Sequence, residues 1–550
     1  MTKKSLLSLF CFFSAFFLLS CGQEKRKDNT IAYATHVILS TLNHHITDKA
    51  SDIIPISNVM EGLMTFDSQG HIVCGTAQSY TISKDGLTYT FKIRPNAKWS
   101  NGDKVTAGDF EFAWKTLAQN QEAPYRYQMI SYLKNGTEVL EGKTDISYLG
   151  VKAINEETLI VNLQKPTPYF LSCLVFAAFF PLNQKVYEEF GSQYGTTDKR
   201  AVYNGAFTIS GWKIDQIWTY LKNPYYWDKE NVKTDEIIVS VISDPQSLRN
   251  AFIAGESDIL SPETGNGKHT IEFLEKEPQK YKRIDFKEAV VEFIFLSPSI
   301  EPSARLLSNK RFRLALSHSI NKKELMDEII GNGSKAIDYF VPYDFTWLAN
   351  ESIDFRDFSG QFNDSLSFNP ALAKKEFETA LKELSAPLEL TISIQNSESS
   401  KLEWEYIKDQ IEKNLPDLKI TLRAAPANQL YDEMGQYMIG AGQMLWSPDF
   451  SDPTTFLDLF KSDNPLNYAK YNNPKYDALL NEASKLRNLN NPKTRFALLA
   501  QAEQILLEDA VIIPIQQRSK TIFTKPNISD IVFTNIGASV FFKFVKVEKQ

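Results

Sequence analysis

The sequence predicts an α/β protein of more than one domain that also contains a smaller α+β subdomain. A chain of 550 residues is longer than one hydrophobic core normally accommodates, so two or three domains are expected. Beyond Leu296, segments with helical and strand patterns alternate, which is typical of an α/β domain with parallel strand pairs. Earlier, residues 83–117 combine turns, an alternating strand and an amphipathic helix, which indicates a compact α+β unit.

The composition is that of a globular protein. Hydrophobic residues make up 43% of the chain and charged residues 23%, and no apolar run after the amino terminus reaches the ~18 residues that a membrane-spanning helix needs. The formal net charge is -7. Nothing in this balance favours nucleic acid or another polyanion as a partner.

The amino terminus has the pattern of an export signal. Lys3 and Lys4 precede a mainly apolar stretch over 6–19, which rises only about 21 Å as a helix and is too short to span a bilayer. We therefore predict a signal peptide over 1–20. The last residues of this stretch and Cys21 resemble a bacterial lipobox, which implies lipidation of Cys21 and a membrane anchor; the alternative is an ordinary signal peptide with an incidental cysteine.

The exported chain is expected to begin with a solvated tether over 21–30. Removal of Lys3 and Lys4 with the signal peptide shifts the formal charge by two, from -7 to -9. Besides Cys21, the mature chain keeps Cys74 and Cys173, too few for a disulfide framework. A single bridge between them and two buried free thiols are both compatible with the sequence.

The α+β unit can be placed residue by residue. Leu87, Tyr89, Phe91 and Ile93 alternate with polar residues, which predicts a half-buried strand after a turn at Asp85-Gly86. A second turn at Asn101-Gly102 is followed by Thr106 and Asp109, which resemble a capping box at the start of a helix. The apolar face of that helix consists of Phe110, Ala113, Trp114 and Leu117.

The next segments alternate between strand and helix patterns. We expect a strand over 158–163, a buried helix over 169–180, and a strand-rich stretch over 201–228 and 236–242. Beyond Leu296 the expected helices are 309–319, 370–384, 401–415, 476–486 and 494–507. The expected strands are 388–394, 419–422, 511–515, 521–523 and 540–547, of which the last two return to the first lobe. A lobe interrupted by another is typical of proteins with a hinged cleft.

No catalytic or metal signature is present. The sequence lacks the H-E-x-x-H, G-x-S-x-G and G-x-G-x-x-G motifs. Residues 136–144 place five residues between two glycines where a phosphate loop needs four, so they are interpreted as a helix end and a turn. His44 and His45 point in different directions on any regular element and lack a spaced third ligand, so we expect polar surface or cleft-lining histidines. The sequence predicts no enzyme activity and no cofactor.

Several ordered blocks of the sequence form a recognisable set. The first is Ser83–Arg94, followed by Ala97–Gly102 and Val105–Phe110. Further blocks occur in chain order at plausible distances: Glu61–Leu63, which precedes Ser83, and then Asn204–Phe207, Asn223–Trp227, Asn309–Leu316 and Trp446–Pro453. Together these blocks resemble the oligopeptide-binding family of extracellular solute-binding proteins, and the resemblance spans nearly the whole mature chain.

The resemblance implies a two-lobed, three-domain periplasmic binding protein fold that closes like a hinge. On this basis the core domain of lobe 1 is expected to comprise 31–60, 186–290 and 517–550, with a subdomain over 61–185. Lobe 2 is expected over 291–516.

The implied function is capture of short peptides between the lobes and delivery to the permease subunits of an ABC transporter. The protein would act as a monomer on the periplasmic face of a bacterial membrane. The same fold also carries other cargo in relatives, so a murein peptide, a metal chelate or a haem-like compound is the alternative. A lipoprotein peptidase would need a nucleophile and base that the sequence does not offer.

The resemblance also assigns ligand contacts. Thr47, Asp48, Lys49 and Ala50 match one peptide-pairing strand of the family. Leu445, Trp446 and Ser447 match the opposing strand.

Asp449 resembles the carboxylate that receives the peptide amine, which accords with the need of a desolvated ammonium for an anion; alternatively it is a loop residue before the turn at Ser451-Asp452-Pro453. Where some members have an arginine for the ligand carboxylate, this chain has Gln443. Pro448 removes one main-chain donor.

Overall fold

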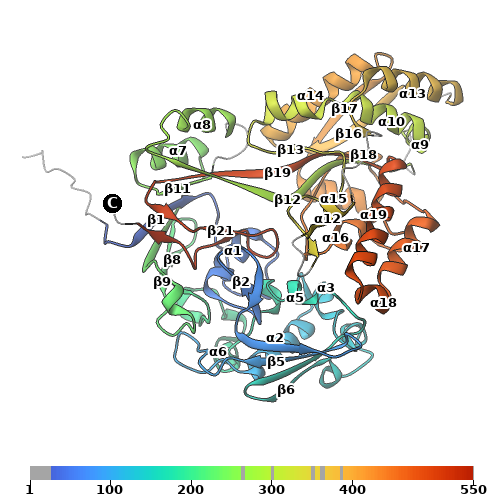
Figure 1. Ribbon diagram of the computed structural model, residues 1–550. Helices are drawn as coiled ribbons and strands as arrows, with labels where there is room; N and C mark the ends of the chain where they lie inside the picture. The colour runs from blue at the N-terminus through green and yellow to red at the C-terminus, as the bar shows by residue number, and fades with distance from the viewer. Residues whose placement is uncertain are drawn as a thin grey trace, which may run out of the picture.

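The computed structural model describes residues 26–261, 267–298, 303–348, 353–359, 366–384 and 388–548 (Figure 1). The predicted signal peptide and Cys21 lie outside the described residues. Arg26, within the predicted tether, already forms an ion pair with Asp258, and the first strand begins at Thr30. The chain is therefore attached to the protein body before the predicted tether ends.

An eleven-stranded mixed sheet runs through the molecule in the order β17-β16-β18-β12-β19-β11-β1-β10-β9-β8, with β13 paired to β19. Its strands are β1 (Thr30–Thr35), β8 (Phe207–Lys213), β9 (Ile217–Lys222), β10 (Glu236–Val241), β11 (Ile259–Leu260), β12 (Lys282–Leu296), β13 (Lys335–Ala336), β16 (Glu389–Gln395), β17 (Lys419–Ala425), β18 (Ala441–Trp446) and β19 (Ile512–Thr524). The antiparallel pair β12 and β19 is long enough to connect the two sides of the molecule (Figure 1).

One end of this sheet is the α/β unit that the sequence predicts. β16 pairs in parallel with both β17 and β18. Three helices, α10 (Lys310–Ser319), α13 (Pro370–Glu383) and α14 (Glu398–Asn414), lie together here (Figure 1). Phe312, Phe377 and Trp404 from these helices pack with Ile294 and Ile392 of the sheet in one core. Asn309, Asn369 and Ser397 accept backbone hydrogen bonds at the three helix starts, which is the usual N-cap arrangement.

The α+β unit contains a four-stranded antiparallel sheet, β4-β5-β7-β6, and the helix α2 (Ala107–Gln119). The strands are β4 (Ala77–Ile82), β5 (Thr88–Ile93), β6 (Val151–Asn155) and β7 (Thr158–Asn162). Tyr89, Phe91 and Ile93 are buried, and Thr106 with Asp109 forms the capping box. The predicted strand, turns and helix of this unit are confirmed.

A second helical layer covers the other face of β12 and β18, where Phe293 meets Phe340 and Phe460. Its helices are α12 (Phe355–Ser359), α15 (Ala427–Gly435), α16 (Thr454–Leu457), α17 (Pro474–Ala483), α18 (Leu486–Leu489) and α19 (Pro492–Glu508). The shorter remaining elements are α1 (Ala50–Val59), β2 (Met64–Phe66), β3 (Ile72–Cys74), α3 (Arg126–Ile130), α4 (Gly136–Leu140), α5 (Phe170–Cys173), α6 (Gln184–Phe190), α7 (Pro245–Ala254), α8 (Gly267–Leu274), α9 (Ala304–Ser308), α11 (Lys322–Glu324), β14 (Trp347–Leu348), β15 (Ile353–Asp354), β20 (Ile528–Ser529), β21 (Val532–Phe533), β22 (Val540–Phe541) and β23 (Lys546–Val547).

Three element predictions are wrong in detail. Residues 169–180 form the four-residue helix α5 and a single 3-10 turn at Ala177–Phe179, because a run that is apolar on every side does not determine a helix by its periodicity. The predicted strands 511–515 and 521–523 are parts of one strand, β19. The predicted strand 540–547 is divided into β22 and β23.

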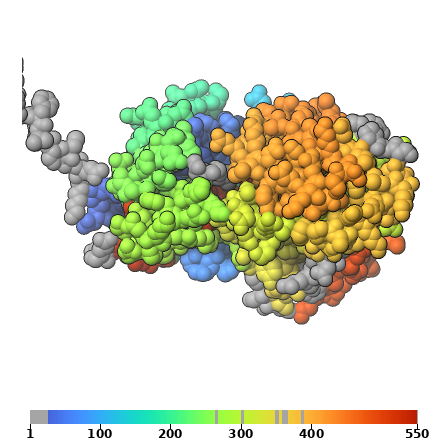
Figure 2. All heavy atoms as spheres, turned by 90° about the horizontal axis from the view of Figure 1, so that it is seen from above, coloured from blue at the N-terminus to red at the C-terminus, as the bar shows by residue number. Residues whose placement is uncertain are grey.

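Seen from above, the surface divides into two masses (Figure 2). One contains the green segment with α7 and α8, and the other contains the orange segment with α14 and its neighbours. Among the residues that the structure describes, no helix is both long and apolar enough to cross a bilayer.

Candidate functional site

Asp449 lies in the loop that connects β18 to α16. Its backbone N–H donates to Oγ1 of Thr455 at 3.1 Å, and its carboxylate accepts a hydrogen bond from the side chain of Gln128 on α3. Burial raises the pKa of Asp449 to about 6, and the Gln128 bond opposes this rise only in part. Asp449 is half-buried at the contact between the β18 loop and the α+β unit, so its carboxylate is partly shielded from bulk water.

The Asp449 loop is fixed from both sides. Asp452 accepts two hydrogen bonds from Arg495 of α19, at 2.7 and 2.8 Å, and this pair is buried. On the opposite side, Phe450 stacks on Tyr169, with ring centroids 3.8 Å apart and planes 7° from parallel. The N–H of Ser451 donates to Oγ of Ser172 at 3.2 Å. These contacts hold the loop against the segment that carries α5.

The other predicted ligand segment, Thr47 to Ala50, is not a strand. Thr47, Asp48 and Lys49 have no regular structure, and Ala50 begins α1. Buried Asp52 fixes the local backbone here, accepting hydrogen bonds from Oγ1 of Thr47 at 2.7 Å and from the N–H of Ser40 at 2.6 Å, and the contacts of this segment with a peptide stay a prediction. Asp48 and Lys49 remain exposed at the surface.

Tyr125 shows that the two predicted segments lie near one another. The pKa of Tyr125 is raised to about 12, chiefly by burial and then by the charges of Asp449 and Asp48. The two carboxylates come from segments about 400 residues apart in the chain and reach the same tyrosine. The structure therefore brings both segments to one place, which sequence periodicity could not have indicated.

One side of β18, the side toward β16, is unpaired by other strands from Leu445 to Ser447. One side of β18 pairs with β12 up to Trp446, opposite Val291. On the other side, pairing with β16 reaches only Gly442, opposite Ser393. An extended peptide can therefore pair with the edge beyond Gly442 by β-augmentation.

Two contacts at this edge use side chains. The hydroxyl of Tyr431 donates to the carbonyl of Leu445 at 3.3 Å. Trp446 is half-buried against the core, and its Nε1 has no hydrogen-bond partner among the described residues. Ser447 is exposed.

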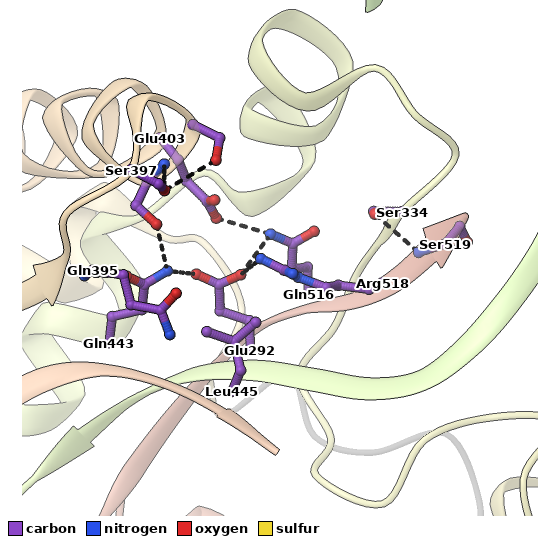
Figure 3. Close-up of polar contacts among 12 residues, drawn as sticks. Glu292, Ser334, Gln395, Ser397, Glu403, Gln443, Leu445, Gln516, Arg518 and Ser519 are labelled. Carbon is purple, nitrogen blue, oxygen red and sulfur yellow. Dashed lines mark hydrogen bonds and ion pairs between the residues drawn. The ribbon is translucent and has the colours of Figure 1, made fainter. Parts of the chain in front are cut away.

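A buried polar network lies under β18, β12 and β19 (Figure 3). At its centre, Glu292 accepts hydrogen bonds from Nε2 of Gln443 at 2.6 Å and Nε2 of Gln516 at 3.0 Å, and it forms an ion pair with Arg518 at 3.2 Å. Gln516 also donates to Glu403 of α14. Sequence reasoning identified Gln443 but missed Arg518, whose only signal was its position in a polar stretch between two apolar strand segments.

A cavity of about 340 Å³ adjoins this network. Its lining comes from α8, the start of α14, and the strand β19, and includes Lys268, Leu402, Glu403, Arg518 and Lys520. In Figure 1, α8 lies on the same side of the molecule as α7, whereas α14 lies with α10 and α13. The cavity is therefore walled by both masses of the molecule.

The histidine prediction is wrong. His44 and His45 are buried, with ring centroids 4.6 Å apart, because this segment packs against Phe180. Burial lowers the pKa of His44 to about 4, so the ring is neutral at neutral pH. In the described part of the chain, no cluster of histidine, cysteine or acidic residues is arranged to hold a metal ion.

The two cysteines of the protein body are not joined by a disulfide. Cys74 and Cys173 are both free thiols. Cys173 is buried, which raises the pKa of its thiol, and its Sγ contacts the carbonyl of Tyr169.

Comparison with known proteins identifies the family. The model for "Bacterial extracellular solute-binding proteins, family 5 Middle" matches residues 71–468. The chain belongs to this family. The match covers the α+β unit, the paired strand β12 and the whole of β16 to β18, so the predicted family is confirmed over the elements that form the site.

Individual family 5 proteins are similar over nearly the whole chain. The "Dipeptide-binding protein" of Lactococcus lactis subsp. cremoris is 29% identical over 546 residues, covering 95% of each chain. The substrate-binding domain of an oligopeptide ABC transporter from Bacillus anthracis superposes with a TM-score of 0.77 at 32% identity, covering 95% of this chain and 99% of that one. OppA of Listeria monocytogenes bound to peptide gives a TM-score of 0.76 at 28% identity, covering 96% and 100%. The fold is therefore the mixed α/β fold of periplasmic binding proteins, as predicted.

Proposed function

We propose that this protein binds short peptides between its two lobes and presents them to an ABC importer. The relatives support this function, since the Lactococcus protein is a dipeptide-binding protein and the Listeria structure contains a peptide. The Bacillus anthracis relative is the substrate-binding part of an oligopeptide ABC transporter. Permease subunits of such a transporter are the proposed protein partners.

The main support for the proposal is the partly shielded carboxylate of Asp449, which lies beside the α+β unit. A carboxylate with its pKa raised by burial gains most from a cationic partner, because the partner offsets the cost of keeping the charge away from water. The α-ammonium of a peptide is such a partner, with three donors in a compact group. The Gln128 contact leaves further acceptor capacity on the two carboxylate oxygens.

Peptide backbone is the second recognition element. With its amine at Asp449, an extended ligand can pair with the open edge of β18 at Leu445, Trp446 and Ser447. On the opposite side, Thr47, Asp48, Lys49 and Ala50 supply main-chain groups, held in place by Asp52. Backbone pairing of this kind does not select side chains, so the protein accepts varied sequences.

The domain division proposed from the sequence fits this mechanism. The subdomain 61–185 contains the four-stranded sheet, and the core domain of lobe 1 contains β1 and β8 to β10. The two boundaries with lobe 2, at 290/291 and 516/517, fall inside the long paired strands β12 and β19. Two strands that continue through both lobes are the connection expected of a hinge.

Calorimetry with defined tripeptides to pentapeptides tests the proposal. Saturable binding of unrelated tripeptides, with weaker binding of a mixture of free amino acids, is the expected result. Absence of binding to any peptide, together with binding of a metal chelate or haem, would reject it. Preference for a murein peptide over linear peptides of equal length would assign the alternative cargo.

The anchor is a separate proposal. Lipidation at Cys21 would hold a monomeric protein on the periplasmic face of a bacterial membrane, with an acyl chain as the anchor. Changing Cys21→Ser is expected to move the protein from the membrane fraction to the soluble fraction, while Cys74→Ser leaves it membrane-bound. A protein that stays with the membrane after Cys21→Ser is anchored by something else.

A further inference from the structure

We propose that Arg518 receives the carboxylate group at the far end of the bound peptide; this inference rests on the proposed peptide-binding function. Some family members have an arginine for the ligand carboxylate at the position of Gln443. We assign that role here to Arg518, which lies on a different strand of the same sheet. It also limits the ligand to short peptides with a free carboxyl end.

Arg518 is positioned for an anion. It lies on β19, and its side chain is 34% exposed and lines the 340 Å³ cavity. Its Nη2 donates to Oε2 of Glu292 at 3.2 Å, and this is its one hydrogen bond to the parts of the chain that the structure describes. Because a guanidinium carries five N–H donors in a planar fork, a second carboxylate can bind beside Glu292.

Glu292 holds the arginine in place without depending on it. Its side chain is fully buried, and both of its oxygens already accept hydrogen bonds from amide groups, those of Gln443 and Gln516. A ligand carboxylate can therefore share Arg518 without leaving an unsatisfied buried charge. In Figure 3 the arginine side chain reaches from β19 toward Glu292.

The cavity lining favours a negative ligand group. Lys268 and Lys520 line it together with Arg518, and the acidic residues at the cavity are Glu288, Glu403 and, through its ion pair, Glu292. Burial raises the pKa of Glu403 and favours its neutral form. Three cationic side chains then face two carboxylates. A bound anion would neutralise this excess positive charge.

The register of the sheet relates this cavity to Asp449. Leu445 of β18 is opposite Glu292 of β12, which is opposite Gln516 of β19. Neighbouring strands are about 4.8 Å apart, so this row is roughly 10 Å wide. Arg518 lies two residues after Gln516 on β19, and Asp449 lies four residues after Leu445. Because β18 and β19 are both antiparallel to β12, they run in the same direction, and both charged residues come after this row.

That spacing sets the length of the ligand. An extended peptide of about three or four residues, at ~3.3 Å per residue, is roughly as long as this row is wide, which favours tripeptides and tetrapeptides as ligands.

The test compares one tripeptide as its free acid and as its C-terminal amide, by calorimetry at neutral pH. Unaltered protein is expected to bind the acid about tenfold or more tightly than the amide, as a charge-assisted contact implies. Arg518→Gln should remove this ratio while leaving amide affinity nearly unchanged. Arg423→Gln, which alters an arginine paired with Glu433 outside the cavity, should keep the ratio.

Two outcomes would overturn the inference: equal affinity of the unaltered protein for acid and amide, or an Arg518→Gln variant that keeps the ratio. Binding of both peptides without discrimination rejects only the role of Arg518, whereas absence of binding to either rejects the proposed function as well. If Arg518→Gln alone does not fold, the double variant Glu292→Gln with Arg518→Gln removes both charges together. It should bind the amide and show no preference for the acid.

Discussion

Asp449 combines burial with charge, and both are needed for its proposed role. A carboxylate in water would bind an ammonium weakly because both ions are already solvated. Here the surrounding residues remove much of that solvent and raise the pKa to about 6. The side chain is therefore mostly ionised at neutral pH but poorly solvated. A peptide amine supplies the hydrogen bonds and the opposite charge that stabilise the carboxylate in place of water.

This raised pKa makes peptide affinity dependent on pH. Binding of an ammonium requires the ionised form of Asp449, so affinity should fall as the pH drops through about 6. From pH 7 to pH 5 the expected loss is about tenfold for a free-amine peptide. Calorimetry across this range checks the result, with the N-acetylated peptide as the control that should lose little. A flat profile for the free-amine peptide would contradict the assignment.

For individual residues, the candidate ligand contacts came from the family resemblance and not from periodicity. Asp449 was identified because it follows Trp446 in a recognisable block, although turn chemistry at Ser451 and Asp452 explains a loop aspartate equally well. Arg518 was missed because its importance comes from Glu292, which is more than 200 residues away in the chain. Sequence spacing does not show which strand of a sheet lies beside which.

Among the elements, the strands and helices with clear periodicity were predicted correctly. β5 and α2 follow directly from the alternation after Leu87 and from the capping box at Thr106. The apolar run at 169–180 was misassigned because its side chains serve contacts on several sides, including the Tyr169 ring against Phe450. Tertiary packing, not local preference, determines such a segment.

The stack of Tyr169 on Phe450 should contribute to ligand affinity by favouring the closed arrangement. An aromatic pair contributes ~0.5–1.5 kcal/mol beyond the area it buries, so Tyr169→Ala is expected to raise the peptide Kd about two- to tenfold. Tyr225→Ala, which removes an exposed tyrosine, should leave the Kd unchanged. Thermal unfolding of each variant confirms that it is folded. Unchanged affinity after Tyr169→Ala would show that the stack does not contribute to closure.

The whole molecule is organised around the two paired strands β12 and β19. The sequence indicated that one lobe interrupts the other, but it divided β19 into two pieces, because Gln516, Gln517 and Arg518 interrupt its apolar pattern. In the structure these polar residues lie in the middle of β19, and Gln516 and Arg518 line the cavity. We propose that this polar interruption is the hinge region.

Closure around a peptide should make the molecule smaller in solution. Small-angle scattering is expected to show a lower radius of gyration with saturating tripeptide than without it, because the lobes rotate toward one another about β12 and β19. The N-acetylated, amidated peptide at the same concentration is the control and should cause a smaller change. A radius that does not change at saturation would contradict hinge closure.

Calorimetry on Asp449→Asn shows whether this carboxylate receives the amine of the bound peptide. With the negative charge removed, binding of a free-amine tripeptide should weaken about ten- to a hundredfold, as expected for loss of a charge-assisted hydrogen bond of ~1.5–3 kcal/mol. The N-acetylated form of the same tripeptide should bind the variant and the unaltered protein almost equally. Equal losses for the two peptides would show that Asp449 does not receive the peptide amine.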